Sequence, residues 1–398
     1  GSKMAQSAYE YPDITPSEIP MWMSIYREMN INRVARGEQR VNLHLHGCPG
    51  SGKTVAVTDT GEAWAANDNL TFYNADSGPI QSDWETTFGF VNFRSALMDS
   101  SDVKGYGHLD VKTGKTVFFP PELLPTHKTH GRYGILFLDD IADAPGLTVR
   151  ALNSLIESGK VGNYVLPDGW LIVAASNQRE WSTGAGKVGS HTNGRFGHFN
   201  VVPSAIDTAN WLVKAGYDVR LANFLRKRPE LIFVFAKVGK DFPTAYPSAR
   251  SWTAAGEMMA VVDDPGILEK GVASFVGEGP ATEFAGYLRM HAAGLEIPSW
   301  VAIQSDPHGA PIPMDDGGQR VALHYVVIGI IANNMATADE LASVVTYTDR
   351  LDKDFQVTLM HDLHDRDSEW FDCPAGIKWK ADNQNVILGQ SRPQLAAA

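Results

Sequence analysis

A glycine-rich segment between two regular elements constrains this chain more than any other stretch of its sequence. Residues 41–46 alternate in polarity and predict a β-strand, and residues 55–66 have the composition of a helix. Between them, residues 47–54 read G-C-P-G-S-G-K-T and match a phosphate-binding loop at every fixed position. Glycines let successive backbone N–H groups converge on an anion, and a helix N-terminus adds partial positive charge. The segment therefore predicts a phosphate site at the start of a helix.

The side chains of this loop have separate expected roles. Lys53 is expected to reach the β- and γ-phosphates of a nucleotide, and the hydroxyl of Thr54 is expected to bind Mg²⁺. Cys48 is either a small packing residue or a redox switch, and packing is favoured because nearby phosphates oppose a thiolate. The residues expected to bind the nucleotide are Gly47, Cys48, Pro49, Gly50, Ser51, Gly52, Lys53 and Thr54.

Composition limits the class of protein. The chain has 398 residues, of which 43% are hydrophobic and 20% charged, as in soluble globular proteins of two or three domains. No run approaches the roughly 20 apolar residues that cross a membrane. The net charge of −12 argues against a whole-surface attraction to nucleic acid or to an anionic membrane. With 2 cysteines no disulfide framework is expected, which favours a reducing cytoplasm.

A second pattern of the kind found at binding sites follows a predicted buried strand. Residues 133–138 form a nearly continuous apolar run, typical of a strand covered on both faces, and Asp139 and Asp140 come directly after it. Ligands of open α/β sheets bind at the carboxyl ends of the strands. We therefore expect Asp139 to hold the Mg²⁺ shell and Asp140 to polarise an attacking water. The alternative is an acidic turn without a chemical role.

Another polar residue follows a later apolar run. Residues 170–175 predict a strand that ends in Ser176-Asn177. If this strand neighbours the one that ends at Asp139, Asn177 lies near the γ-phosphate. Otherwise Asn177 is a turn-forming residue.

The remaining patterns predict the rest of the fold. Residues 88–93 are favoured over 70–73 as the second core strand, with 68–86 as an insertion, and residues 298–318 and 369–398 are expected to be irregular. We expect helices at 16–29, 147–158, 210–215, 220–226, 319–335, 337–350 and 355–366, a helical region at 246–295, a hairpin around Thr113-Gly114 and a last strand at 231–235.

Taken together, residues 40–255 resemble the AAA+ ATPases and, within them, the MoxR-like branch. The phosphate loop matches the Walker A motif, and I-L-F-L-D-D at 135–140 resembles Walker B. Asn177 falls at the sensor 1 position. Arg195 in N-G-R-F resembles the arginine finger, with an ordinary surface arginine as the alternative. Arg250 in P-S-A-R-S-W resembles sensor 2, with a lid arginine paired to a surface acid as the alternative.

Longer stretches make the resemblance more specific. The stretch S-D-V-K-G…D-V-K-T-G-K-T-V-F-F-P-P-E-L-L-P looks like the hairpin that MoxR-like proteins insert in their second helix. The run L-N-S-L-I-E-S-G-K-V-G-N-Y-V-L-P-D-G-W-L-I-V-A-A-S-N fits with a hairpin before sensor 1. The arrangement, including F-L-R-K-R-P-E-L at 224–231, is also similar to MoxR-like ATPases carried by bacteriophages.

The chain departs from the family pattern at two positions. Walker B usually ends in Asp-Glu, whereas here it ends in Asp139-Asp140, which sets the last carboxylate back by about 1.5 Å. A misplacement near 1 Å can cost about a hundredfold in rate, so we expect ATP binding to survive and hydrolysis to be slow, with compensation by the loop as the alternative. Ala249 replaces the proline that usually precedes the sensor 2 arginine, which we expect to be a mild change.

The resemblance implies an α/β fold, namely a P-loop AAA+ core with a parallel sheet flanked by helices, followed by an all-helical lid and a further helical region. The expected segments are an N-terminal arm and helix at 1–38, the core at 39–245, the lid at 246–297 and the C-terminal region at 298–398.

The resemblance also implies a function, that of an Mg-ATP-dependent ATPase acting as a ring, commonly a hexamer. Arg195 is expected to reach into the site of the neighbouring subunit, and Arg250 to read phosphate from the lid. The favoured activity is chaperone-like remodelling of an unidentified protein client, by a phage-encoded protein in the cytoplasm of a bacterial host. The alternatives are a DNA-associated motor or loader, with nucleic acid as the less favoured partner, and a nucleotide-gated assembly scaffold with slow hydrolysis.

Two further clusters invite a functional interpretation. His361 and His364 can share a helix face and hold a metal, but no third ligand is identifiable, so a solvated helix end is favoured. The basic residues 226–228 could contact nucleic acid or a neighbouring subunit, and a solvated face is favoured because charge clusters usually form one.

Overall fold

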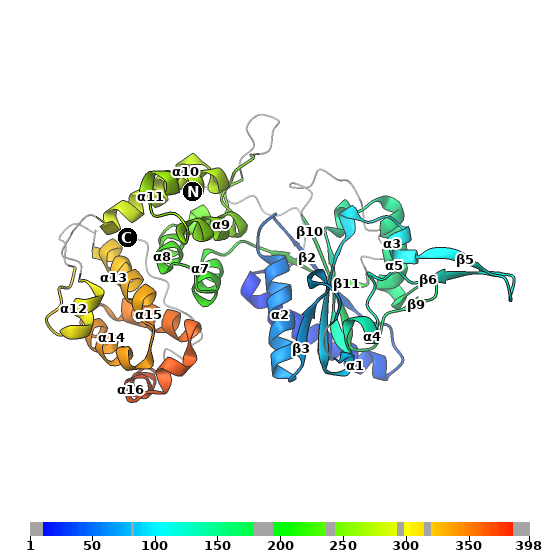
Figure 1. Cartoon of the computed structure of the whole chain (residues 1–398), viewed down its shortest axis with the longest axis horizontal. Coiled ribbons are helices and arrows are strands. Elements are labelled where there is room, and N and C mark those ends of the chain that lie inside the picture. The colour runs from blue at the N-terminus through cyan, green and yellow to red at the C-terminus, as the bar shows by residue number, and fades with distance from the viewer. Residues whose placement is uncertain are drawn as a thin grey trace. The chain divides into compact units, whose positions relative to one another are not determined.

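The computed structural model describes residues 11–80, 83–177, 194–235, 243–292, 298–313 and 320–384. Contacts within the chain divide it into two compact units, Gly1–Pro203 and Ser204–Ala398. The first unit contains a large sheet and the second is helical in its described parts (Figure 1). None of the helices in the described ranges combines the length and the apolar character that a bilayer crossing requires.

A seven-stranded sheet forms the centre of the first unit, with the strand order β1-β11-β2-β10-β7-β4-β3. The strands are β1 (Asp13–Ile14), β2 (Asn42–Gly47), β3 (Thr71–Asn74), β4 (Thr87–Arg94), β7 (Tyr133–Asp139), β10 (Trp170–Asn177) and β11 (Phe196–Val201). Every neighbouring pair is parallel. Strands β2, β10 and β7 are neighbours in the middle of the sheet, so their carboxyl ends lie side by side at the same end of the strands.

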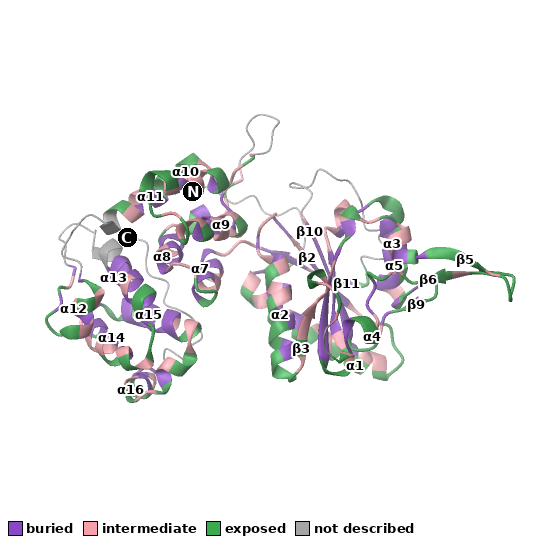
Figure 2. Ribbon diagram, viewed as in Figure 1, coloured by how far each residue is buried: buried purple, intermediate pink, exposed green. Residues whose placement is uncertain are grey.

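Helices cover both faces of this sheet, which explains why its central strands read as apolar runs (Figure 2). Helices α1 (Ile19–Ala35) and α2 (Lys53–Asn67) bury Met23 and Val57 on one face, among side chains of β2, β4 and β7. Helix α5 (Gly146–Ser158) buries Leu152 on the other face, among side chains of β7 and β10. The short helices α3 (Ser101–Lys104) and α4 (His127–His130) complete this unit.

Two hairpins extend the first unit. Strands β5 (Tyr106–Asp110) and β6 (Lys115–Phe119) pair antiparallel, and Gly114 takes the left-handed backbone (φ 66°) at their turn, which confirms the predicted hairpin. This hairpin extends away from the sheet of its unit (Figure 1) and exposes the apolar side chains of Tyr106, Leu109, Val111, Phe118 and Phe119. The second hairpin, β8 (Lys160–Val161) and β9 (Tyr164–Val165), precedes β10 as expected.

The second unit is built from helices around two apolar clusters. Its helices are α7 (Ala205–Lys214), α8 (Val219–Lys227), α9 (Ala249–Met259), α10 (Pro265–Val276), α11 (Glu278–Ala292), α12 (Trp300–Ser305), α13 (Arg320–Asn334), α14 (Leu341–Thr348), α15 (Lys353–Arg366) and α16 (Pro374–Asp382). One cluster, around Trp252 and Phe284, joins α7–α11, and the other, around Tyr347 and Leu359, joins α12–α16 with α7 and α8.

Three sequence predictions of local structure are wrong. Residues 231–235 form no strand, because Leu231 and Ile232 pack into the apolar cluster of α7–α11, and β11 is the strand that follows β10. The expected loop 298–318 contains α12, whose first turn is capped when the backbone N–H of Ala302 donates to the Ser299 hydroxyl. The last expected irregular segment contains α16, which begins at a proline and buries Trp379.

The prediction for the second core strand needs one addition. Strand β4 pairs with β7 as expected, but residues 71–74 also form a strand, β3, which extends the same sheet beyond β4. The fold class expected from the sequence is confirmed, as a parallel sheet flanked by helices followed by a helical region. The contact units divide the chain at residues 203 and 204, and the finer limits 39–245, 246–297 and 298–398 stay a prediction.

Candidate nucleotide-binding site

The backbone of the phosphate loop is shaped by close packing at its start and by left-handed glycines within it. Gly47 ends β2, and a Cβ at this position would lie 2.7 Å from the carbonyl oxygen of Val201 in β11. Gly50 and Gly52 have φ values of 74° and 90°, which glycine adopts without a steric cost. Helix α2 begins immediately afterwards at Lys53, so its unpaired N-terminal N–H groups lie at the loop. This geometry fits an anion site.

Lys53 is buried inside the loop. Its Nζ donates to the carbonyl oxygen of Cys48 at 3.0 Å and to Oγ of Ser51 at 3.2 Å. Both acceptors are neutral. An ammonium group held by neutral acceptors in a glycine loop can exchange them for phosphate oxygens, which form stronger charge-assisted hydrogen bonds.

An acidic edge lies across from the loop, at the end of β7. Oγ1 of Thr54 donates to Oδ2 of Asp139 at 3.4 Å. Burial, together with the neighbouring Asp140, raises the pKa of Asp139 above its ordinary value. A half-buried carboxylate beside a second acid and a hydroxyl oxygen has the hard oxygen donors that Mg²⁺ prefers. Thr54 and Asp139 therefore fit the expected metal ligands.

Asp140 and Asn177 meet at the same edge. Nδ2 of Asn177 donates to Oδ1 of Asp140 at 3.4 Å, and the amide of Asp140 donates to Oδ1 of Asp139 at 3.1 Å. The register pairs Asn177 with Gly47, so β10 ends beside the start of the loop. The structure thus brings together the loop, both acids and Asn177, while their chemical roles stay predictions.

Arg195 lies at the end of the sheet where β2 and β11 begin, opposite to the phosphate loop. It precedes β11, and its carbonyl oxygen accepts from the backbone N–H of Asn42, the first residue of β2. From Phe196 to Val201 the strand rises by about 16 Å before it reaches the level of the phosphate loop. The exposed side chain of Arg195 therefore cannot contact a nucleotide in the loop of its own chain.

Arg250 belongs to the second unit, at the start of α9. Ser248 caps this helix by accepting from the backbone N–H of Ser251, and the Ser251 hydroxyl accepts from the backbone N–H of Ser248 in return. The Arg250 side chain is exposed. Its expected contact with phosphate stays a prediction.

Two other sequence candidates have structural rather than chemical environments. Burial raises the pKa of the Cys48 thiol to about 11, so the thiolate required for redox chemistry is scarce at neutral pH. The expected solvated face at residues 226–228 is wrong for Arg226, whose guanidinium donates to both carboxylate oxygens of Asp362 at 2.6 and 2.7 Å. Arg226 is therefore not available to nucleic acid.

Sequence reasoning missed a group of three histidines in the first unit. Among the described residues, His44, His46 and His198 are the one group of three or more potential metal ligands whose donor atoms lie close together, all within 4.8 Å. His361 and His364, for which the sequence favoured a solvated helix end over a metal site, are not part of such a group. The alternation H-L-H at 44–46 signals a shared strand face, but only the pairing of β2 with β11 adds the third imidazole.

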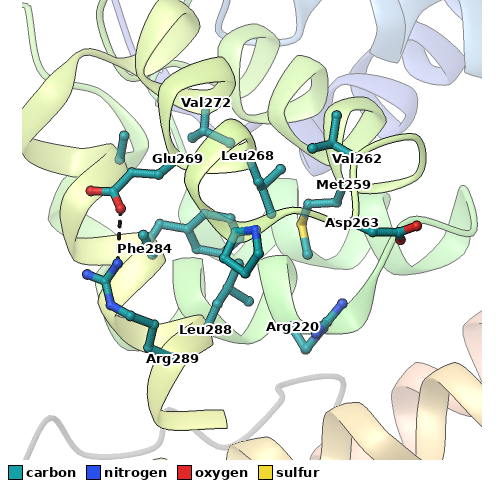
Figure 3. Close-up of a pocket in the computed structure, with 13 residues that line it drawn as sticks. Arg220, Met259, Val262, Asp263, Leu268, Glu269, Val272, Phe284, Leu288 and Arg289 are labelled. Carbon is teal, nitrogen blue, oxygen red and sulfur yellow. Dashed lines mark hydrogen bonds and ion pairs between the residues drawn. The ribbon is translucent and has the colours of Figure 1, made fainter. Parts of the chain in front are cut away.

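A pocket of about 300 Å³ lies in the second unit, among α8, α9, α10 and α11 (Figure 3). Apolar side chains such as Leu268 and Phe284 line it, and the ion pair between Glu269 and Arg289 stands at one side. None of the site residues predicted from the sequence lines this pocket. Its mostly apolar wall does not offer the converging polar groups of a nucleotide site.

Comparison with known proteins finds only weak likeness to solved structures. No family model and no curated relative matches the sequence. Similar solved structures include the Thermotoga maritima RuvB Holliday junction branch migration motor, with 15% identity over 69% of this chain and 70% of that chain and a TM-score of 0.33. The Aeropyrum pernix ORC2 protein is 11% identical over 92% of this chain and 97% of that chain, with a TM-score of 0.32. A structure of Hsp104 with FITC casein is 10% identical over 71% of this chain and 48% of that chain, with a TM-score of 0.30. At these identities and scores, the chemistry of the site has to be argued from this chain's own residues.

Proposed function

We propose that this chain is an Mg-ATP-dependent AAA+ ATPase of MoxR type that works as an oligomeric ring on a protein partner. One observation carries the proposal. The glycine loop, both acids of β7 and the amide of Asn177 lie at one edge of the parallel sheet, whereas Arg195 is exposed at the opposite edge. Such a site can hold a nucleotide, whereas the Arg195 side chain lies too far along β11 to reach it within the same chain.

The residues divide the proposed reaction among them. Lys53 exchanges its two neutral acceptors for phosphate oxygens. Thr54 and Asp139 hold Mg²⁺, which when bound neutralises charge on the phosphates. Asp140 accepts the hydrogen bond of the attacking water, and Asn177 fixes the Asp140 carboxylate in place. The short side chain of Asp140 makes this step slow.

The position of Arg195 supports a ring. In a ring, the exposed arginine of one subunit enters the nucleotide site of the next, where it stabilises transition-state charge. An arginine supplied in this way accelerates nucleotide hydrolysis by about 10³–10⁵-fold. We therefore expect Arg195→Ala to abolish most ATP turnover and leave ATP affinity nearly unchanged.

Mixed rings test the shared site directly. Arg195→Ala chains keep an intact loop, and Lys53→Met chains keep an intact arginine, so neither is active alone. Mixing the two restores part of the turnover only where an Lys53→Met chain supplies its arginine to an Arg195→Ala neighbour. Full turnover of Arg195→Ala alone, or a mixture that forms rings without recovering activity, would contradict the proposal.

A protein partner is favoured over nucleic acid by two observations. The β5–β6 hairpin exposes five large apolar side chains, a surface suited to protein contact, and Arg226 of the expected basic cluster is buried. The experiment is a pull-down with Asp140→Asn held in ATP, compared with the same variant carrying Phe118→Ser and Phe119→Ser. A protein that is captured by the first and lost with the second supports a remodeller, while recovery of nucleic acid alone supports the DNA motor.

The second candidate function is a nucleotide-gated scaffold, which the short Asp140 side chain favours. A scaffold assembles with ATP and releases negligible phosphate even when its partner is present. Sedimentation and phosphate release, measured on one sample with the captured partner, separate the two functions. A phage origin and a bacterial host cytoplasm belong to the same proposal and rest on the sequence resemblance alone.

A further inference from the structure

We propose that His44, His46 and His198 form a binding site for one divalent transition-metal ion, with Zn²⁺ as the ion of best fit. The site lies between β2 and β11, which are neighbours in the sheet (Figure 1). It is separate from the Mg²⁺ ligands Thr54 and Asp139, and it does not depend on the proposed ATPase function.

Strand geometry places the three imidazoles on one face of the sheet. Residues 44 and 46 are two apart on β2 and therefore share a face, and the parallel register pairs His198 of β11 with His44. Nε2 of His46 lies 2.9 Å from Nδ1 of His198. The pairing of two distant segments thus gathers three nitrogen ligands.

The distances are close to those of a metal site. The three donor atoms lie within 4.8 Å of one another. A tetrahedral zinc ion with Zn–N bonds of about 2.0–2.1 Å needs nitrogen separations of about 3.4 Å. The separation between His46 and His198 is already shorter than this, so the His44 ring has to approach by about 1.4 Å, within the reach of side-chain rotation.

The hydrogen bonds of the cluster leave one ring nitrogen of His44 without a partner. Oγ of Ser176 lies 2.8 Å from Nε2 of His44 and 3.2 Å from Nδ1 of His46. His44 is 1% exposed, and its Nδ1 has no hydrogen-bond partner. A buried polar atom without a partner is costly, and a metal ion bound to this nitrogen would give it one. Ser176 then fixes ring orientation from behind the ligands.

The surroundings of the cluster enclose the imidazoles. Burial lowers the pKa of His44 well below its ordinary value and the pKa of His46 to about 3, with the neighbouring histidines acting in the same direction. The ring of Tyr11 stacks on His46 and His198 at centroid distances of 4.7 and 4.8 Å and covers them.

The donor set also selects the metal. Three imidazoles without a carboxylate suit Zn²⁺, Cu²⁺ or Ni²⁺, whereas Mg²⁺ requires oxygen ligands. Three protein ligands leave the fourth tetrahedral position open to water. Millimolar Mg²⁺ therefore does not compete for this site.

Metal titration of the full chain tests the proposal. After chelator treatment and dialysis, calorimetry with ZnCl₂ in excess Mg²⁺ is expected to give one ion per chain with a Kd below about 1 μM. His198→Gln is expected to weaken binding by at least about a hundredfold, and Ser176→Ala by about 10- to 100-fold. The matched control is His364→Gln, which changes an exposed histidine of α15 and leaves binding unchanged.

A spectroscopic measurement on the unmodified chain guards against a variant that fails to fold. Co²⁺ in place of Zn²⁺ is expected to give the visible absorption of a tetrahedral site, at one equivalent. Zinc binding that is equal in His198→Gln and the unmodified chain would overturn the assignment. The absence of both stoichiometric zinc and tetrahedral cobalt bands would overturn it as well.

Discussion

The two units bury polar groups in opposite ways. In the second unit, the side chains of Arg226 and Asp362 are 7% and 0% exposed and meet through two short hydrogen bonds, with Asn223 and Asn210 accepting from the same guanidinium. In the first unit, the buried Lys53 has neutral acceptors, and the half-buried Asp139 has a like charge beside it. In the second unit the cation is hydrogen-bonded directly to an anion, whereas in the first unit the Lys53 ammonium group donates to neutral oxygens.

This difference separates charged side chains that stabilise the fold from charged side chains that bind a ligand. A buried ion pair joined by two hydrogen bonds is shielded from any ligand in solvent, so we expect its contribution to be structural. A buried cation whose hydrogen bonds go to neutral oxygens, beside an acidic strand end, is stabilised further when an anion and a divalent cation bind. Burial alone therefore does not identify function, and the kind of acceptor that a buried cation meets is a better indicator.

The largest effect on stability is expected when the buried ion pair of Arg226 and Asp362 is broken. Asp362→Ala leaves the Arg226 charge buried without a partner and should lower the free energy of unfolding by about 3–5 kcal/mol. Urea denaturation followed by circular dichroism measures this change. The double variant Arg226→Met with Asp362→Leu removes both charges and should recover most of the loss. A single variant within about 1 kcal/mol of the unmodified chain would remove the contrast between the units.

The second effect concerns Lys53, the buried cation of the phosphate loop. Lys53→Met should change the stability of the nucleotide-free chain by about 1–3 kcal/mol, since two hydrogen bonds from the ammonium group to neutral acceptors are lost. At ATP concentrations of about one hundred times Kd, the unmodified chain gains about 2.7 kcal/mol from ligand binding, and the variant should lose this gain. Thermal unfolding with and without Mg-ATP measures both numbers. An undiminished ATP shift in the variant would show that Lys53 does not hold phosphate.

A smaller effect is expected at the start of the phosphate loop, where the backbone is closely packed. Gly47→Ala places a methyl group 2.7 Å from the carbonyl oxygen of Val201, and such overpacking costs about 1–3 kcal/mol. Gly146→Ala is the matched control, because a Cβ there meets no atom within 4 Å at the start of α5. Chemical denaturation of both variants should show a loss only for Gly47. Equal stability of the two would mean that the strand ends can separate freely.

The smallest effect is expected at an ion pair in solvent. Asp76 and Arg94 are paired at 3.0 Å, with side chains 48% and 57% exposed. Asp76→Asn should change the free energy of unfolding by less than about 1 kcal/mol, because water screens both charges. The same urea series measures this change. A loss comparable with that of Asp362→Ala would show that burial is not what separates the two pairs.

The sequence predicted features that depend on local pattern. The glycine loop, the apolar run before Asp139 and the hairpin at Gly114 are each encoded within a few neighbouring residues, and the structure has them where expected. Asn177 joined Asp140 because two consecutive apolar strands proved to be neighbours.

Features that depend on distant pairing could not be predicted in this way. An apolar run at 231–235 looks like a strand in isolation, and only its packing among helices shows otherwise. The burial of Arg226 depends on an acid more than a hundred residues later in the chain. His198 joins His44 and His46 only through strand register, to which no local pattern in the sequence points.

The backbone at Asp140 limits which residues can be inherited at this position. Its φ of 51° lies in the left-handed region, which aspartate, asparagine and glycine tolerate and which costs other residues about 1–2 kcal/mol. A glutamate at position 140 would have a side chain one methylene longer, which brings its carboxylate closer to the attacking water. Its backbone would be less stable in the left-handed conformation. The length of the side chain at position 140 is therefore coupled to the handedness of the backbone, and a substitution that changes one alters the energy of the other.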